Sequence, residues 1–518
     1  MKKITSISLA VMMGLATLGV AGCGNTVAND ANTVQIYAFS GGYGVDWLKE
    51  MEKKYEAANP DIKIEISSDG MLGKADAMVR AGEVQTTDLY FTTEGVMKWL
   101  HEGNGVVKGY DFVLEPLDEV YEYTPIAGDP RTVADLMNES YKDNCRYFYY
   151  DKDDEYVSNY FSLPWSGNVT GIVYNKTLFD EHDIAVPRTT EELWEVCADI
   201  KKIDGKVPFV SSTETGYAEY LLQTWITQYM TIKEVEYFWN GKDRNGVFGP
   251  SLWTHEGRLY ALEAYEKMLG VEYGNSHKNV NSMTFTQAQA QVLNGNCLMM
   301  VNGDWIENEM KDKAGNYTLD IMRAPVLSKI VEKTSFKNES NAEEILRQLI
   351  SFIDGEEGAV QPEKANDTDV ALIREARNVT YGLLNHNAYI PAYATAKEAA
   401  KDFLKYMCTQ EAFDIYYEKT GGGILPLDYA VDEANVSVMQ KSKLNMYEKA
   451  SYVPMMTKYA MYHTGGLSYF LGSTKSPEHA FTAKNPADRK TPQYIYEHTI
   501  ELGKQRAFDR IAEKAGLI

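Results

Sequence analysis

Apolar and polar residues alternate at 33–38 and again at 62–66, and this pattern predicts two β-strands. Between them, apolar residues recur at helical spacing over 48–58. Strand, helix and strand in this order predict a β-α-β unit with parallel strands. A helical pattern at 74–81 and an apolar strand at 88–91 continue the winding. We therefore predict an α/β fold.

The later sequence is mainly helical from about 175 to 320, where Thr190 is predicted to be the N-cap of one helix. Residues 327–378 are polar and helical and interrupt the α/β pattern, so we predict a surface insertion there. Strand-like alternation returns at 379–394, followed by a helix at 397–417. A run of three glycines and a helical tail complete the chain.

Residues 1–22 are predicted to be a lipoprotein signal peptide. The apolar run 4–20 is too short and too rich in small residues for a comfortable spanning helix. It leads through Val20-Ala21-Gly22 into Cys23, which resembles the lipobox of bacterial lipoproteins. Two acyl chains on the Cys23 sulfur would hold the protein on the outer face of the cell membrane. Residues 23–32 would then form a flexible, lipid-anchored tether.

The chain has 518 residues and a formal net charge of −23. Its length favours two or three domains over a single core. The negative charge argues against nucleic acid and anionic membrane surfaces as partners. We therefore expect contact with the membrane only through the lipid.

Four cysteines remain after the leader, and none has the C-x-x-C spacing of a metal site. Buried, inert thiols are the prediction for Cys145, Cys197, Cys297 and Cys408, although two disulfides in any of three pairings stay open. Aromatic residues are plentiful, with 36 Tyr and 8 Trp. Their rings are suited to stacking on the apolar faces of sugars.

Four segments together resemble the extracellular solute-binding proteins of bacterial ABC sugar importers, the family of maltodextrin- and multiple-sugar-binding proteins. They are the strand, glycine-rich turn and helix before Asn59-Pro60-Asp61-Ile62-Lys63-Ile64; Gly171-Ile172-Val173-Tyr174-Asn175-Lys176 with Leu178-Phe179, Pro187 and Glu191-Glu192-Leu193; Leu293 to Met300 with Asn302-Gly303-Asp304-Trp305; and Ala399 to Tyr406 with the glycine run and Pro426. The resemblance spans most of the chain after the leader.

The resemblance implies a two-lobed α/β protein with several hinge crossings and a ligand cleft between the lobes. The expected N-terminal lobe comprises 33–163 and 379–420, and the expected C-terminal lobe comprises 164–326 and 424–518. The 327–378 insertion departs from the typical member of the family, and whether it caps the cleft stays open. The implied function is to capture an oligosaccharide by hinge closure and deliver it to a membrane permease, as a monomer without cofactor or catalysis.

Some binding residues are predicted from the strand ends. In an open α/β sheet, ligands lie beyond the carboxyl ends of strands. Ser40 and Tyr43 follow the first strand, and Thr92 and Glu94 follow the strand at 88–91. A plain tight turn is the alternative for both. A phosphate loop is disfavoured at Ser40 because no Lys-Ser/Thr follows the glycines.

Other binding residues are implied by the resemblance alone. Trp305 would stack on a sugar, and Asp304 would be a further binding residue beside it. Trp165 and Asn168 would lie at a hinge crossing. Tyr217 and Tyr220 would supply stacking rings. Gly422 and Gly423 would serve as hinge and cleft wall, and Tyr469 and Phe470 would be late aromatic contacts. For the aromatic side chains, packing in the core is the alternative.

Other functions stay open at this stage. A surface glycoside hydrolase needs only two facing carboxylates, although no catalytic signature is present. A receptor for a peptide or for ferric iron is a further alternative, with tyrosine pairs at Tyr149-Tyr150 and Tyr416-Tyr417. The acidic run of Asp151, Asp153, Asp154 and Glu155 lacks the pattern of an EF-hand, so we predict a solvated loop, with calcium as the alternative.

Overall fold

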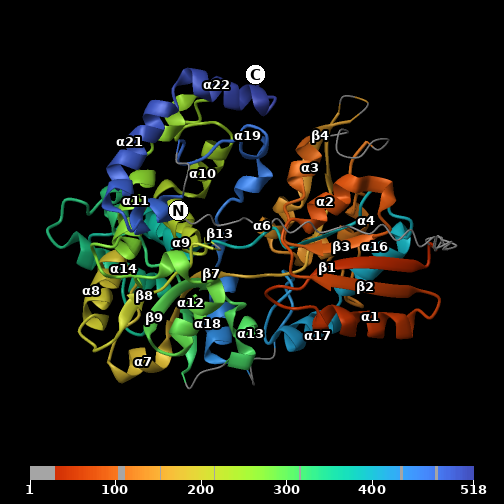
Figure 1. Ribbon diagram of the computed structural model, residues 1–518, viewed down its shortest axis with the longest axis horizontal. Helices are drawn as coiled ribbons and strands as arrows, with labels where there is room; N and C mark the ends of the chain where they lie inside the picture. Colours follow the sequence, from red (N-terminus) through yellow and green to blue (C-terminus); the bar gives the residue numbers. More distant parts are fainter. Residues whose placement is uncertain are drawn as a thin grey trace, which may run out of the picture.

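The computed structural model shows two α/β lobes side by side, each built on its own sheet (Figure 1). The structure describes residues 30–102, 111–151, 153, 155–214, 216–313, 317–431, 436–472 and 476–518. The predicted leader and Cys23 lie outside these residues. No helix in the described ranges combines the length and apolar character needed to span a bilayer.

The N-terminal lobe contains a five-stranded sheet in the order β2-β1-β3-β12-β6. Strand β1 is parallel to β2 and β3, and β12 is antiparallel to β3 and β6. The strands are β1 (Thr33–Phe39), β2 (Lys63–Asp69), β3 (Leu89–Thr92), β6 (Leu163–Pro164) and β12 (Asn387–Tyr389). The predicted β-α-β unit is thus confirmed, with α1 (Asp46–Ala58) between β1 and β2.

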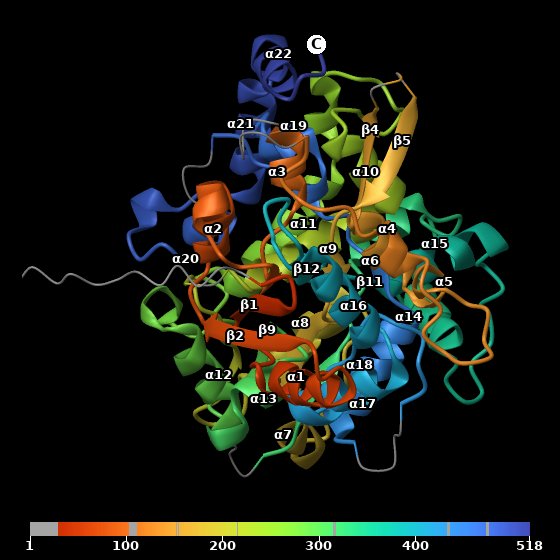
Figure 2. The same cartoon turned by 90° about the vertical axis from the view of Figure 1, so that its right-hand side faces the viewer.

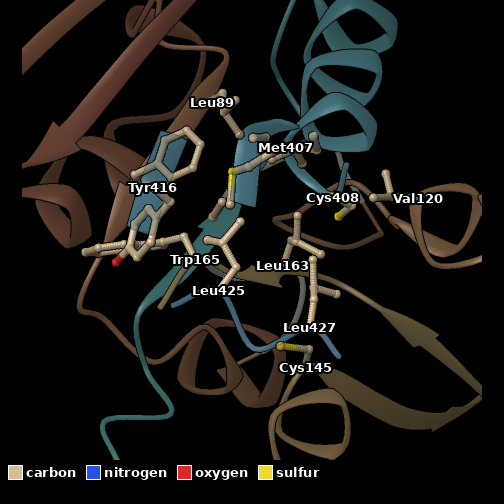
Figure 3. Close-up of a cluster of buried hydrophobic side chains, with 14 of the residues drawn as sticks. Leu89, Val120, Cys145, Leu163, Trp165, Met407, Cys408, Tyr416, Leu425 and Leu427 are labelled. Carbon is tan, nitrogen blue, oxygen red and sulfur yellow. The ribbon is translucent and has the colours of Figure 1, made fainter. Parts of the chain in front are cut away.

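Helices cover both faces of this sheet (Figure 2). On one face, α1 packs with α16 (Lys397–Met407) and α17 (Gln410–Thr420), and on the other lie α2 (Lys74–Ala81) and α3 (Met97–Glu102). Trp165 and Tyr416 are buried in the first of these cores (Figure 3). A hairpin of β4 (Arg146–Tyr150) and β5 (Tyr156–Tyr160) and three short helices complete the lobe: α4 (Asp118–Tyr121), α5 (Val133–Leu136) and α6 (Glu139–Asn144).

The C-terminal lobe contains a four-stranded sheet in the order β10-β7-β9-β8. These strands are β7 (Thr170–Asn175), β8 (Val207–Phe209), β9 (Cys297–Gly303) and β10 (Leu319–Met322). Its two faces are covered by α9 (Ala218–Met230) and α11 (Gly257–Leu269) on one side and by α12 (Phe285–Leu293) and α18 (Val438–Glu448) on the other. The remaining helices of this lobe include α7 (Lys176–Glu181), α8 (Thr190–Ile200), α10 (Ile232–Trp239), α13 (Ile306–Glu309), α19 (Ala460–His463), α20 (Pro477–Thr482), α21 (Pro492–Leu502) and α22 (Gln505–Lys514).

The N-cap predicted for α8 was wrong by one residue. Thr189, rather than Thr190, accepts a hydrogen bond from the Glu192 backbone N–H, and the Glu192 carboxylate accepts in return from the Thr189 backbone. This reciprocal pair is a capping box, which satisfies two backbone donors at the helix start. Thr189 has an extended backbone, so the helix begins at the next residue.

The chain crosses between the lobes in several segments that hydrogen-bond to one another. The short strand β11 (Val379–Thr380) pairs in parallel with β13 (Ser451–Tyr452). The Thr380 hydroxyl donates to the Thr170 carbonyl over 2.9 Å, and Asn168 Oδ1 accepts the Leu383 backbone N–H over 2.7 Å. The crossings therefore form a joined hinge rather than separate linkers.

Residues 327–378 form a compact helical unit. Its helices, α14 (Ala342–Asp354) and α15 (Asp367–Asn378), enclose a small apolar core that includes Leu349, and α15 contacts α9. Arg347 bonds Glu195 of α8 over 2.9 Å, which adds a polar tie to the C-terminal lobe. The cysteines at 145, 197, 297 and 408 are all buried as free thiols.

Leu349→Ala should destabilise the protein by about 2–5 kcal/mol, because it leaves a cavity in this small core. Denaturant unfolding measures the loss. Val360→Ala, in the same segment but 75% exposed, is the matched control and should change the free energy of unfolding little. Equal effects of the two substitutions would show that the unit has no core of its own.

Candidate functional site

A cavity of about 660 Å³ lies between the lobes. Its N-terminal wall consists of the turn after β1 and the residues around β3 and β12, and its C-terminal wall consists of the starts of α9, α12 and α13. The lining residues are Phe39, Ser40, Gly41, Gly42, Tyr43, Gly70, Leu72, Thr93, Glu214, Tyr217, Tyr220, Phe285, Trp305, Glu309, Leu383, Asn385 and His386. Aromatic rings and polar side chains alternate with small residues in this lining, a combination that is typical of ligand sites.

The aromatic part of the wall is held by ring contacts. Tyr217 lies edge-on to Trp305 at 6.1 Å between ring centroids, and Tyr220 stacks on Tyr381 at 4.7 Å. Gly303 makes room for Trp305, because a Cβ at Gly303 would lie 2.0 Å from the ring. Trp305 lines the cavity although its side chain is only 3% exposed.

The turn after β1 is bonded directly to the opposite lobe. The Tyr43 hydroxyl donates to Asp304 Oδ1 over 3.0 Å, and Asn308 Nδ2 donates to the Gly42 carbonyl over 2.5 Å. Gly42 has a φ of +66°, a left-handed conformation that glycine adopts without strain. The lobes are therefore in contact along one side of the cavity.

Asp304 also belongs to a buried ion pair that reaches the hinge. Its Oδ2 lies 3.5 Å from Lys443 Nζ, and Lys443 donates a hydrogen bond to the Gly422 carbonyl. Burial raises the pKa of Asp304, and the Lys443 charge opposes that rise. Burial likewise lowers the pKa of Lys443, opposed by Asp304. Neither charge faces the cavity, so we interpret the pair as a structural tie between lobe and hinge.

The polar side chains of the wall come from both lobes. Glu309 accepts from Gln289 Nε2 over 2.7 Å, and burial raises the pKa of Glu309. Asn385 Nδ2 donates to the Thr93 carbonyl over 2.5 Å. The His386 Nδ1–H donates to the Leu383 carbonyl over 3.1 Å, and burial lowers the pKa of His386 to about 4. The neutral ring thus keeps Nε2 as a hydrogen-bond acceptor.

Five of the predicted site residues line the cavity together: Ser40, Tyr43, Tyr217, Tyr220 and Trp305. The structure places the other seven outside its wall. Asp304, Gly422 and Gly423 belong to the ion-pair network and the hinge crossing beside it, and Asn168 fastens the hinge. Thr92 and Trp165 pack behind the wall, where the Trp165 indole donates to the Thr92 carbonyl over 3.0 Å. The backbone N–H of Glu94 donates to the Thr92 hydroxyl over 3.3 Å. Tyr469 and Phe470 lie in the core of the C-terminal lobe.

Several lining residues were missed by the sequence reading. Leu383, Asn385 and His386 lie on a hinge crossing, and a crossing has no periodicity that would mark it. Glu214 and Phe285 lie beside helix starts; the capping box of Thr284 was the available signal for Phe285. Glu309 lies one helical turn beyond Trp305 and was within reach of the sequence, because residues four apart share a helix face.

The other candidate features lie elsewhere. Tyr149 and Tyr150 are on the β4–β5 hairpin, where Asp151 Oδ1 accepts the backbone N–H groups of Asp153 and Glu155. These two bonds tie Asp153 and Glu155 back to Asp151, and Asp154 lies outside the described residues. In the described part of the chain, no three His, Cys, Asp or Glu side chains are grouped as metal ligands.

The family model of bacterial extracellular solute-binding proteins matches residues 41–412, and the chain belongs to this family. The diacetylchitobiose binding protein NgcE of Streptomyces coelicolor is 24% identical over 345 residues, which cover 62% of this chain and 66% of the relative, just under two thirds of its length. The multiple sugar-binding protein of Streptococcus mutans is 22% identical over 335 residues, which cover 63% of this chain and 70% of the relative.

Solved structures show the same fold. A chitin oligosaccharide binding protein superposes with a TM-score of 0.58 at 14% identity, covering 92% of this chain and 99% of that one. The solute-binding protein RafE in complex with raffinose gives 0.53 at 14% identity, covering 93% and 98%. At 14% identity the similarity is evidence for the fold alone. This fold is the two-lobed α/β architecture expected from the sequence.

Tyr43→Phe should weaken contact between the lobes, because it leaves a buried oxygen of Asp304 without its donor at a cost of about 1–3 kcal/mol. Small-angle scattering should show a larger radius of gyration. Tyr37→Phe is the matched control, because Tyr37 donates to Asp69 over 2.9 Å within a single lobe. An unchanged radius in Tyr43→Phe would mean that this bond does not hold the lobes together.

His386 should make stability depend on pH. Its folded-state pKa of about 4 lies below the ordinary 6.5, so the unfolded chain binds the proton first as pH falls. The free energy of unfolding should therefore drop between about pH 6.5 and 4, by on the order of 3 kcal/mol. In His386→Asn this part of the drop should disappear, whereas replacing the exposed His182 by Asn should retain it. Parallel pH profiles for wild type and His386→Asn would contradict the assignment.

Proposed function

We propose that the protein is the sugar receptor of an ABC importer, which captures an oligosaccharide between its lobes and delivers it to a membrane permease. The observation that carries the proposal is the interlobe cavity, whose aromatic wall is paired with carboxylate and amide groups from both lobes. Aromatic rings cover the apolar faces of sugar rings, and the polar groups bond their hydroxyls. The two relatives, a diacetylchitobiose binding protein and a multiple sugar-binding protein by name, support the same class of ligand.

The cycle that we propose is hinge closure. Sugar binds one lobe in an open state, and closure then brings the second wall onto it. Tyr43 and Asn308 reach across the lobes only when these are together, so their bonds add to the closed state. A ligand favours closure by its additional contacts there. We propose that the permease recognises this closed form, and that a lipid on Cys23 keeps the monomeric receptor at the outer face of the membrane.

A thermal-shift screen against neutral, amino and acidic oligosaccharides tests the proposal. A ligand at 100 times its Kd should stabilise the protein by about 2.7 kcal/mol. Tyr217→Ala removes a ring from the wall and should weaken binding at least about tenfold. Tyr260→Ala, on α11 of the same lobe but outside the wall, should bind as wild type does. A shift with peptides or ferric salts but with no sugar would refute the proposal.

A further inference from the structure

The charged side chains of the cavity wall are acidic, and its uncharged hydroxyls, such as those of Ser40 and Tyr217, can donate or accept hydrogen bonds. Glu214 and Glu309 contribute carboxylates from the C-terminal lobe. Asn385 contributes an amide from the hinge crossing, and its Nδ2 is already bonded to the Thr93 carbonyl, which leaves Oδ1 buried without a partner in the protein. His386 adds a ring nitrogen that accepts, because its Nδ1–H is engaged by Leu383. Glu214 already accepts from the Phe285 backbone N–H over 2.9 Å and Glu309 accepts from Gln289, so Asn385 Oδ1 is the acceptor among these that most needs a donor from a ligand.

Cationic side chains do not contribute to this wall. Among the described residues that line the cavity, none is Lys or Arg. Lys443 contacts Asp304, the neighbour of Trp305, but does not line the cavity. It is buried, paired with Asp304 and bonded to the Gly422 carbonyl. Its charge is thus already used within the protein and is not presented to a ligand.

We infer that the cavity selects oligosaccharides of neutral or amino sugars and excludes acidic ones, with Glu214 and Glu309 as the residues that set this selection. The inference rests on the proposed function and narrows its ligand class. The carboxylate of an ionised uronic acid only accepts hydrogen bonds, and no Lys or Arg among the described lining residues offers it a charged donor. Closure would also bury it beside Glu214 and Glu309, with no paired cation to offset the cost. Hydroxyl, acetamido and ammonium groups all donate and match the wall.

Glu309 is placed to exert this selection when the lobes meet. It ends α13, next to Asn308, whose side chain bonds the Gly42 carbonyl of the other lobe. Gln289 bonds one carboxylate oxygen and fixes its orientation. Asn385 lines the same cavity from the segment that leads into β12. The acceptors thus come from two walls that closure brings around one ligand.

Isothermal titration of the purified protein with matched oligosaccharides tests the inference. The probes are trigalacturonate and its methyl ester, xylotriose with and without a glucuronic acid branch, cellotriose, triacetylchitotriose and the glucosamine trimer. Each acidic member should bind at least about 100-fold more weakly than the best neutral or amino member. Glu309→Gln should weaken that best ligand by about 10- to 100-fold, because a charged acceptor is lost. Glu344→Gln, an exposed carboxylate on α14, is the matched control and should change nothing.

The outcomes separate the two proposals. Binding of an acidic sugar within about tenfold of its neutral counterpart would overturn the inference while leaving the receptor function intact. Unchanged preference in both Glu309→Gln and Glu214→Gln would overturn the role of the carboxylates. No binding of any oligosaccharide would overturn the proposed function itself. Thermal melts of each variant establish that it folds, and Glu214→Gln gives a second, less buried position to compare with Glu309→Gln.

Discussion

The arrangement of this molecule depends on one buried carboxylate at the junction of the two lobes. Asp304 accepts from Tyr43 of the N-terminal lobe and pairs with Lys443, which in turn bonds the hinge at Gly422. Two charges removed from water are costly unless they remain together, so breaking the pair would leave an uncompensated charge. The same group therefore fixes the end of β9, the turn after β1 and the position of the hinge.

The positions of the two cavity walls depend on that junction. Because the turn after β1 is fastened to α13, its glycines and Tyr43 form one wall, while Trp305 and Tyr217 form the opposite one. The aromatic rings give the site apolar surface and the acceptors give it hydrogen-bonding direction. Chitin-oligosaccharide and raffinose receptors have the same fold. In this chain, the charge of the two lining carboxylates, Glu214 and Glu309, would help to decide which solute is taken.

The helical unit at 327–378 lies away from the cavity. It has its own apolar core and its ties run to α8 and α9, and none of its residues lines the cavity. From the sequence alone its polar composition suggested only a surface location. Its amphipathic helices supplied enough apolar surface for a separate core, and that required both helices to be placed together.

The sequence by itself determined the α/β class, the β-α-β unit and the lipobox-like start, because these depend on local periodicity and on residues next to each other in the chain. It also singled out Ser40, Tyr43, Tyr217, Tyr220 and Trp305, all of which line the cavity. Only the tertiary structure decided that Trp165 and Asn168 pack in the core and hinge while Glu309 and Asn385 reach the site. Those roles arise from contacts between segments up to some three hundred residues apart, and no local pattern encodes which face of such a segment will meet its partner.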